Sequence, residues 1–399
     1  MDMKFLAPLV SIALAFAMSG CSTDSSGSGD HETLPPALPS NPDQTVTFPK
    51  TTGPPPTTRP PPTNACTGHK IGIYSWSQDY WSEGDPALTD FIQSDMGRTW
   101  NCGELYINVA DPTNYNIIKY QPQLVAWMKK WREDSGNDAI IWLTYGDVTE
   151  RDGQKMCAFV NTYEQFLIRS VSAEDMAEIA PIGISFDVEH VPDDYYLKAL
   201  TSSREMIANV TKGMGYLPNS IFVGSTIEGE PNQQETTYVM QNADRALMML
   251  YRNSVNGTNN DGLLERMQWM LTDQCVVCTQ PGWEDLKAKI TIMVEGSCEM
   301  GNGCGKLSMC AYDTSKYPDP NGGIEYVWDS LQDLTNEMVP AGILTQDQYN
   351  KLFDVNGTLY AIHNWEWSRC YYGDSFSQQN NYTDCIQNYH LDASSCRTE

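Results

Sequence analysis

The chain is short of basic residues. It has 25 Lys and Arg against 51 Asp and Glu, which gives a formal net charge of -26 over 399 residues. A nucleic-acid backbone would be repelled by this charge, and no basic cluster offsets it. Neutral sugars or cations are better partners, and the diffuse acidity is interpreted as a means of keeping an exported protein in solution, with cation association as the alternative.

Motifs of several enzyme and metal classes are also missing. The sequence contains no H-E-x-x-H, no G-x-S-x-G and no calcium-loop pattern of the EF-hand type, which excludes zincin-type metalloproteases and serine hydrolases of the nucleophile-elbow class. Its five histidines are scattered, and His190 is interpreted as a structural histidine, with substrate contact as the alternative. We therefore expect no metal and no cofactor.

Long apolar runs are absent as well. The run Phe5 to Met18 follows Lys4, is too short to span a bilayer, and predicts a secretory signal over residues 1–21. Met18-Ser19-Gly20-Cys21 resembles a bacterial lipobox, so a lipid anchor at Cys21 is the alternative to simple cleavage. Both predict a secreted, extracellular protein without a transmembrane segment, and the anchor would place it at the cell surface or wall.

Residues 22–65 have few large apolar side chains and are rich in Pro, Thr, Ser and Gly. Such a segment cannot offset the entropy of ordering, so it is predicted to be a disordered stalk that could carry O-linked sugars. The folded domain is expected over residues 66–399, and its N-x-T sequons would mark a glycoprotein if the source is eukaryotic.

Cysteine is abundant, with 12 residues. In an exported chain this favours disulfides over zinc or redox chemistry. Cys275 and Cys278 have the spacing of half a metal site, but disulfide bonding is the preferred interpretation outside the cell. The connectivity cannot be derived from the spacing.

Short apolar runs recur through the folded part, and each ends in polar or aromatic residues. They alternate with helix-like segments such as Gln123 to Glu133 and Asp193 to Thr211. This alternation predicts a parallel α/β sheet, and eight runs predict a (β/α)8 TIM barrel. The alternative, a doubly wound sheet, would need a Gly-rich turn after the first run, where Trp76 to Trp81 stands instead. The runs are 71–76, 105–109, 139–144, 181–190, 220–225, 245–250, 289–294 and 359–363.

The carboxyl ends of these runs gather acids and aromatic rings, as a carbohydrate-binding cleft requires. In the fourth run, Asp187 and Glu189 are two residues apart and would project from one face of a strand. Two close carboxylates tend to separate into an acid and an anion, which is the arrangement that glycoside hydrolysis uses. The substrate-binding residues predicted at these ends are Trp76, Asp79, Tyr145, Glu228, Tyr251, Trp365 and Glu366.

The fourth run resembles the D-G-x-D-x-D-x-E motif of family 18 glycoside hydrolases. Gly183, Asp187 and Glu189 match it, whereas Ile182 and Ser185 stand at the first two Asp positions. Met249-Leu250-Tyr251 is similar to the family's M-x-Y, with Arg252 where the family has an acid, and Trp365 is placed like the Trp that floors the family's cleft. The resemblance implies Glu189 as general acid, Asp187 as the residue that orients the substrate's N-acetyl group, and Tyr251 as its hydrogen-bond partner.

Two alternatives remain open. Glu295, directly after the seventh run, stands where many retaining barrel glycosidases carry a nucleophile, so an ordinary double displacement with Glu189 as the acid is a second route. Both routes describe a retaining glycoside hydrolase. The other function is a lectin-like barrel that binds a glycan without cutting it, since one fold hosts many functions.

Overall fold

The computed structural model describes residues 68–93, 95–100, 102–110, 115–147, 149–250, 262–296, 315–316, 322–354 and 359–363. The predicted signal, the stalk and Cys21 lie outside these residues. Eight parallel strands close into a barrel in the order β1 to β8, which confirms the predicted (β/α)8 fold. Each strand pairs with the next along the chain, and β1 pairs with β8 through Ile71 and Tyr360.

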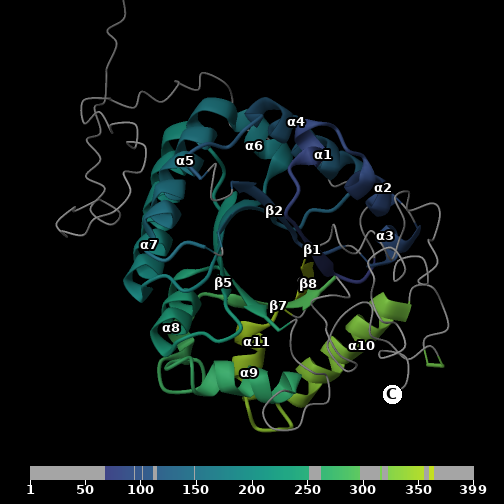
Figure 1. Cartoon of the computed structure of the whole chain (residues 1–399), viewed down its shortest axis with the longest axis vertical. Helices are drawn as coiled ribbons and strands as arrows, with labels where there is room; N and C mark the ends of the chain where they lie inside the picture. The colour runs from purple at the N-terminus through teal and green to yellow at the C-terminus, as the bar shows by residue number, and fades with distance from the viewer. Residues whose placement is uncertain are drawn as a thin grey trace, which may run out of the picture.

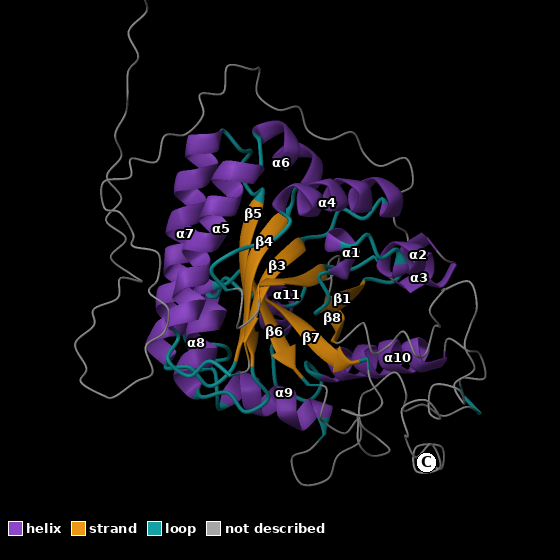
Figure 2. Ribbon diagram, turned by 45° about the horizontal axis from the view of Figure 1, so that its top comes forward, coloured by secondary structure: helices purple, strands orange, loops and turns teal. Residues whose placement is uncertain are grey.

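The strands occupy the predicted runs and stand at the centre of the molecule (Figures 1 and 2). They are β1 (Ile71–Ser75), β2 (Leu105–Ala110), β3 (Ile141–Asp147), β4 (Ile182–Val188), β5 (Ile221–Ile227), β6 (Arg245–Met249), β7 (Lys289–Glu295) and β8 (Tyr360–His363).

Helices surround the strands (Figure 1). They are α1 (Asp79–Ser82), α2 (Ala87–Gln93), α3 (Asp95–Trp100), α4 (Gln121–Ser135), α5 (Gln154–Ser170), α6 (Ala173–Ile179), α7 (Asp193–Met214), α8 (Gln233–Asn242), α9 (Leu263–Thr272), the 3-10 turn η1 (Trp283–Asp285), α10 (Gly322–Glu337) and α11 (Gln346–Leu352). No described helix has the length and apolar character that crossing a bilayer requires.

The helix ends follow local chemistry. Helix α7 has Asp193 and Asp194 in its first turn. Gly215 caps its C-terminal end, and the φ of 73° at this residue lies in the left-handed region that glycine adopts without strain. Ser172 and Asp175 form a reciprocal capping box at the start of α6. These signals fix where the chain leaves each helix and returns to the barrel.

The residues of each strand alternate between two apolar environments. In β4, Ile182, Ile184 and Phe186 belong to the large core between barrel and helices. The opposite faces of the strands contribute a second, smaller cluster inside the barrel, which is composed of Tyr74, Tyr106, Trp142, Leu247, Met249, Met293 and Ala361. Strand alternation therefore places Gly183, Ser185 and Asp187 on the inner face.

Trp142 fills the barrel interior beside β4 and β5. A Cβ at Gly183 would lie 2.2 Å from its Cε3 atom, and a Cβ at Gly224 would lie 2.9 Å from its Cζ3 atom. The motif glycine Gly183 thus has a packing role, because a larger residue would collide with the indole ring.

A charged network lies inside the barrel near the amino-terminal ends of its strands. Glu104 accepts hydrogen bonds from Trp142 Nε1 at 2.9 Å, from Tyr106 Oη at 2.5 Å and from Arg245 Nε at 3.0 Å. A further bond joins Arg245 Nη2 to the second oxygen of Glu104. The Glu104 carboxylate and the Arg245 guanidinium are both buried, so each charge is stabilised mainly by the other.

Cys275 and Cys278 form a disulfide, which confirms the interpretation preferred over zinc for this pair. Cys102 and Cys157 each take part in a disulfide as well.

Candidate functional site

Strand β4 delivers two acids toward the inside of the barrel at its carboxyl end. Asp187 lies on the face opposite Phe186 and Val188, both of which belong to the outer core. Glu189 follows with the same parity just beyond the strand, and 26% of its side chain is exposed. Glu189 is thus the member of the pair that solvent can reach.

The Asp187 carboxyl is almost fully buried. Burial raises its pKa, and the negative charge of Glu189 acts in the same direction. The imidazole of His363 and polar contacts with Tyr74 and Thr226 partly offset this rise. Asp187 therefore holds a proton to higher pH than an ordinary aspartate.

A second inward pair comes from the last two strands. Glu295 ends β7 and is fully buried, and its Oε2 lies 3.6 Å from Nδ1 of His363 at the end of β8. Trp76 Nε1 donates to His363 Nε2 at 3.2 Å. Because Nε2 accepts this bond, a neutral His363 carries its proton on Nδ1, facing Glu295.

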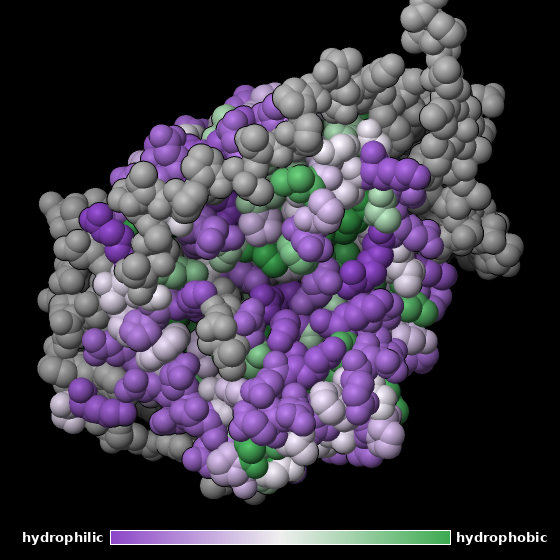
Figure 3. Space-filling view, turned by 180° about the vertical axis from the view of Figure 1, so that it is seen from behind, coloured by the Kyte–Doolittle hydropathy of each residue, from purple (hydrophilic) through white to green (hydrophobic). Residues whose placement is uncertain are grey.

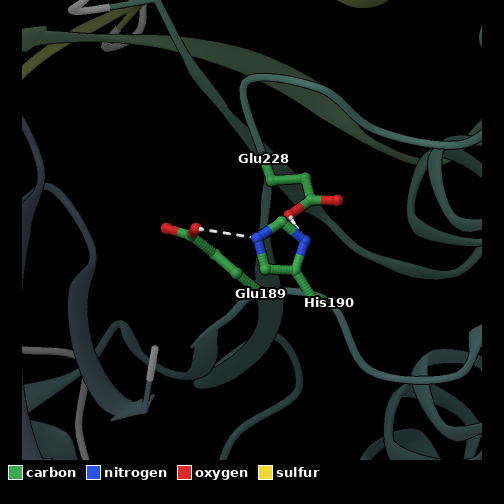
Figure 4. A group of neighbouring side chains, drawn as sticks. All are labelled: Glu189, His190 and Glu228. Carbon is green, nitrogen blue, oxygen red and sulfur yellow. Dashed lines mark ion pairs between the residues drawn. The ribbon is translucent and has the colours of Figure 1, made fainter. Parts of the chain in front are cut away.

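Glu228, which follows β5, is buried beside the same acids. Burial raises its pKa, the charge of Glu189 adds to the effect, and His190 partly offsets it. His190 Nδ1 lies 2.9 Å from Glu228 Oε2, and His190 Nε2 lies 3.8 Å from Glu189 Oε2. Figure 4 shows the imidazole between the two carboxylates. One ring nitrogen and one oxygen from each acid all lie within 4.8 Å of one another, so this group has the geometry to hold a cation.

The structure thus brings Trp76, Asp187, Glu189, Glu228 and Glu295 to the carboxyl end of the barrel. His363 was not among the predicted site residues. The signal for it was present, because a histidine that ends a strand with the inward parity of Ala361 must face the same interior.

Tyr145 was predicted to bind substrate, and the structure places it away from the barrel interior. It shares the outer face of β3 with Leu143 and stacks on Phe159 of α5 at 5.4 Å between ring centroids. Its hydroxyl donates to Glu150 Oε2 at 2.9 Å and lies 3.2 Å from Asp147. Tyr145 is therefore a buried part of the layer between strand and helix.

The other predicted residues fall in two groups. Asp79 is exposed in the first turn of α1. Tyr251, Trp365 and Glu366 lie outside the described residues, so their roles remain predictions.

Ser185 stands inside the barrel where the family 18 motif has an acid. Its side chain is buried, and its Oγ atom has no hydrogen-bond partner among the described residues. Asp187 therefore lacks the carboxylate neighbour that the motif would supply on this side.

The molecular surface opposite the view of Figure 1 is largely hydrophilic, with hydrophobic residues in small groups (Figure 3). Beside the acids, an open pocket of about 570 Å³ is lined by polar side chains and by the start of α7. Its lining residues are Arg151, His190, Val191, Pro192, Asp193, Asp194, Asn232 and Gln234.

No protein-family model matches the chain, and no curated protein matches its sequence. Solved structures with a similar fold include a chitinase from Ipomoea carnea, 13% identical, with 76% of this chain and 98% of that one covered and a TM-score of 0.39. A xylanase and α-amylase inhibitor protein from Scadoxus multiflorus is 11% identical, with 82% and 99% covered and a TM-score of 0.41. A chitinase-like lectin from tamarind is 10% identical, with 78% and 100% covered and a TM-score of 0.39. The likeness is one of fold alone.

Proposed function

We propose that this protein is a retaining glycoside hydrolase in which Glu189 is the general acid. The observation that carries the proposal is the placement of Glu189, which is partly exposed at the carboxyl end of β4 beside the buried Asp187. In barrels of this kind the carboxyl ends of the strands carry the active site. A general acid must be open to solvent and to the substrate, and the partial exposure of Glu189 at this end of the barrel supports that role.

The two acids divide the work according to burial. Asp187 is buried and its pKa is raised, whereas Glu189 is partly exposed and solvent can reach its carboxyl group. Glu189 would protonate the glycosidic oxygen, and Asp187 would orient an N-acetyl group whose oxygen attacks the anomeric carbon. The bond to the leaving group breaks as the oxygen bonds to carbon, and water later opens this intermediate with retention of configuration.

Glu295 supports the same assignment by its surroundings. Glu295 Oε2 lies 3.6 Å from His363 Nδ1, and this contact would have to open before the carboxylate could attack an anomeric carbon. We therefore assign Glu295 to holding His363 and Trp76 in place, and the substrate-assisted route takes precedence over double displacement.

A lectin-like protein is the second candidate function. It is favoured by Ser185, because the motif acid that helps to tune Asp187 is replaced there by a neutral hydroxyl. Such a barrel would bind N-acetylated glycans in the same place and release them uncut.

The protein is proposed to act outside the cell, as a secreted or surface-attached form. The disulfide between Cys275 and Cys278 supports this, because disulfides persist in oxidising compartments.

The test is turnover of labelled chitin oligosaccharides, β-glucan and N-glycans by the full chain and by three variants. Glu189→Gln should lower kcat by about 100-fold or more, the usual contribution of a general acid. Glu295→Gln should retain most of the activity if no covalent intermediate forms on it. Glu178→Gln, which changes an exposed acid on α6, is the control.

Full activity of Glu189→Gln would refute the assignment of the acid. Binding of a glycan without any turnover by the unaltered chain would establish the lectin-like function instead.

A further inference from the structure

Glu189, His190 and Glu228 form a compact set of ligand atoms at the end of β4 and β5. A ring nitrogen and one oxygen from each carboxylate lie within 4.8 Å of one another (Figure 4). Bonds of about 2.0 to 2.2 Å in tetrahedral geometry place ligand atoms roughly 3.3 to 3.6 Å apart. The group could therefore close around an ion by side-chain shifts of about 1 Å.

Glu228 provides a second, independent observation. Its side chain is more than nine-tenths buried, and its Oε2 atom receives no hydrogen bond from any described residue. His190 Nδ1 lies 2.9 Å away, at ion-pair distance but outside hydrogen-bond geometry, so it satisfies this oxygen only when the imidazole is charged. A buried carboxylate oxygen without a donor is costly, and a cation between it and the imidazole would satisfy it.

The backbone holds His190 in this place. Its φ of 62° lies in the left-handed region, which non-glycine residues seldom adopt. The turn directs the imidazole back toward β5, while 54% of the side chain remains exposed. The same histidine lines the open pocket of about 570 Å³, so an ion has a route from solvent and space for water ligands.

We propose that Glu189, His190 and Glu228 bind a divalent transition-metal cation of the Zn²⁺ class. One imidazole nitrogen with two carboxylate oxygens leaves a fourth position for water, and imidazole favours Zn²⁺ over Ca²⁺ or Mg²⁺. The net charge of -26 adds a general attraction for cations.

The site also has a consequence for catalysis, which rests on the proposed function. A metal-bound Glu189 is held ionised and cannot donate a proton to a glycosidic oxygen. Zinc therefore acts as a reversible inhibitor, and chelation restores the activity.

Calorimetric titration of the EDTA-treated, dialysed full chain with ZnCl2 tests the site without any substrate. The unaltered chain should bind one Zn²⁺ at this site, and Glu228→Gln should weaken binding by about tenfold or more. Glu230→Gln removes an equal charge from an exposed position two residues away and should leave binding unchanged. His190→Asn, which keeps a residue that tolerates positive φ, should weaken binding as Glu228→Gln does.

Equal affinity in the unaltered chain and in both ligand variants, or no binding at all, would overturn the metal site. The activity readout is separate. Zinc binding without inhibition would support the metal site and refute Glu189 as the acid. Loss of turnover in Glu189→Gln, with no zinc binding by the unaltered chain, would support Glu189 as the acid and refute the metal site.

Discussion

Glu104 is the residue whose removal should most weaken the barrel. Its carboxylate receives hydrogen bonds from Tyr106, Trp142 and Arg245 inside the barrel. The side chains of Glu104 and Arg245 are only 3% and 7% exposed. Burial and the nearby Glu104 raise the pKa of Tyr106, so its hydroxyl remains a donor.

Glu104→Gln keeps the size of the side chain but removes its charge. It leaves the buried guanidinium of Arg245 without this counter-ion, for which we expect a loss of about 3 to 5 kcal/mol in the free energy of unfolding. Lys130 and Asp134 provide the comparison, since their charged atoms are 2.5 Å apart but the two side chains are 65% and 15% exposed. Asp134→Asn should cost only about 0.3 to 0.5 kcal/mol, because water screens the pair.

Urea unfolding followed by far-UV circular dichroism measures both variants, with the slope against urea checked for constancy. The double variant Glu104→Gln, Arg245→Met should recover much of the loss, because it removes the unpaired charge and keeps an amide oxygen as acceptor for Tyr106 and Trp142. If Glu104→Gln costs no more than Asp134→Asn, or if the double variant is as unstable as Glu104→Gln, burial does not decide the strength of this pair.

Two further predictions concern packing and pH. Gly183→Ala should lower the free energy of unfolding by about 1 to 3 kcal/mol, because the added Cβ would lie 2.2 Å from Trp142. The control Gly229→Ala, whose Cβ would have its nearest neighbour at 3.8 Å, should be neutral. Thermal unfolding measures both variants, and equal losses would contradict this packing argument. Burial raises the pKa of Glu235 well above 4.5, so its contribution to stability is fully present below about pH 4.5 and is lost as the pH rises through the folded-state pKa. Glu235→Gln should therefore reduce the fall in Tm between pH 4.5 and 8, and an unchanged slope would exclude this group as its cause.

Part of the site follows from local sequence. Side chains two residues apart on a strand lie on the same face, so Asp187 and Glu189 lie together, whether that face points into or out of the barrel. The polar residues that begin at Asp187 mark the carboxyl end of β4. The apolar runs give all eight strands because strand formation depends on neighbours along the chain.

Which face points inward was beyond the sequence for some strands. Strand β3 is apolar on both faces, so hydrophobicity could not show that Trp142 fills the interior while Tyr145 packs against α5. That choice depends on the glycines at 183 and 224, which belong to other strands and make room for the indole.

The amino-acid sequence by itself determined the barrel, its strand positions and the acidic pair of β4, because these depend on local periodicity. Tertiary structure alone decided which distant residues meet. Glu104 and Arg245 pair across 141 positions, and Trp76 and His363 pair across 287. Closing the barrel brings the two ends of the sheet together, and no local pattern records the distances that result.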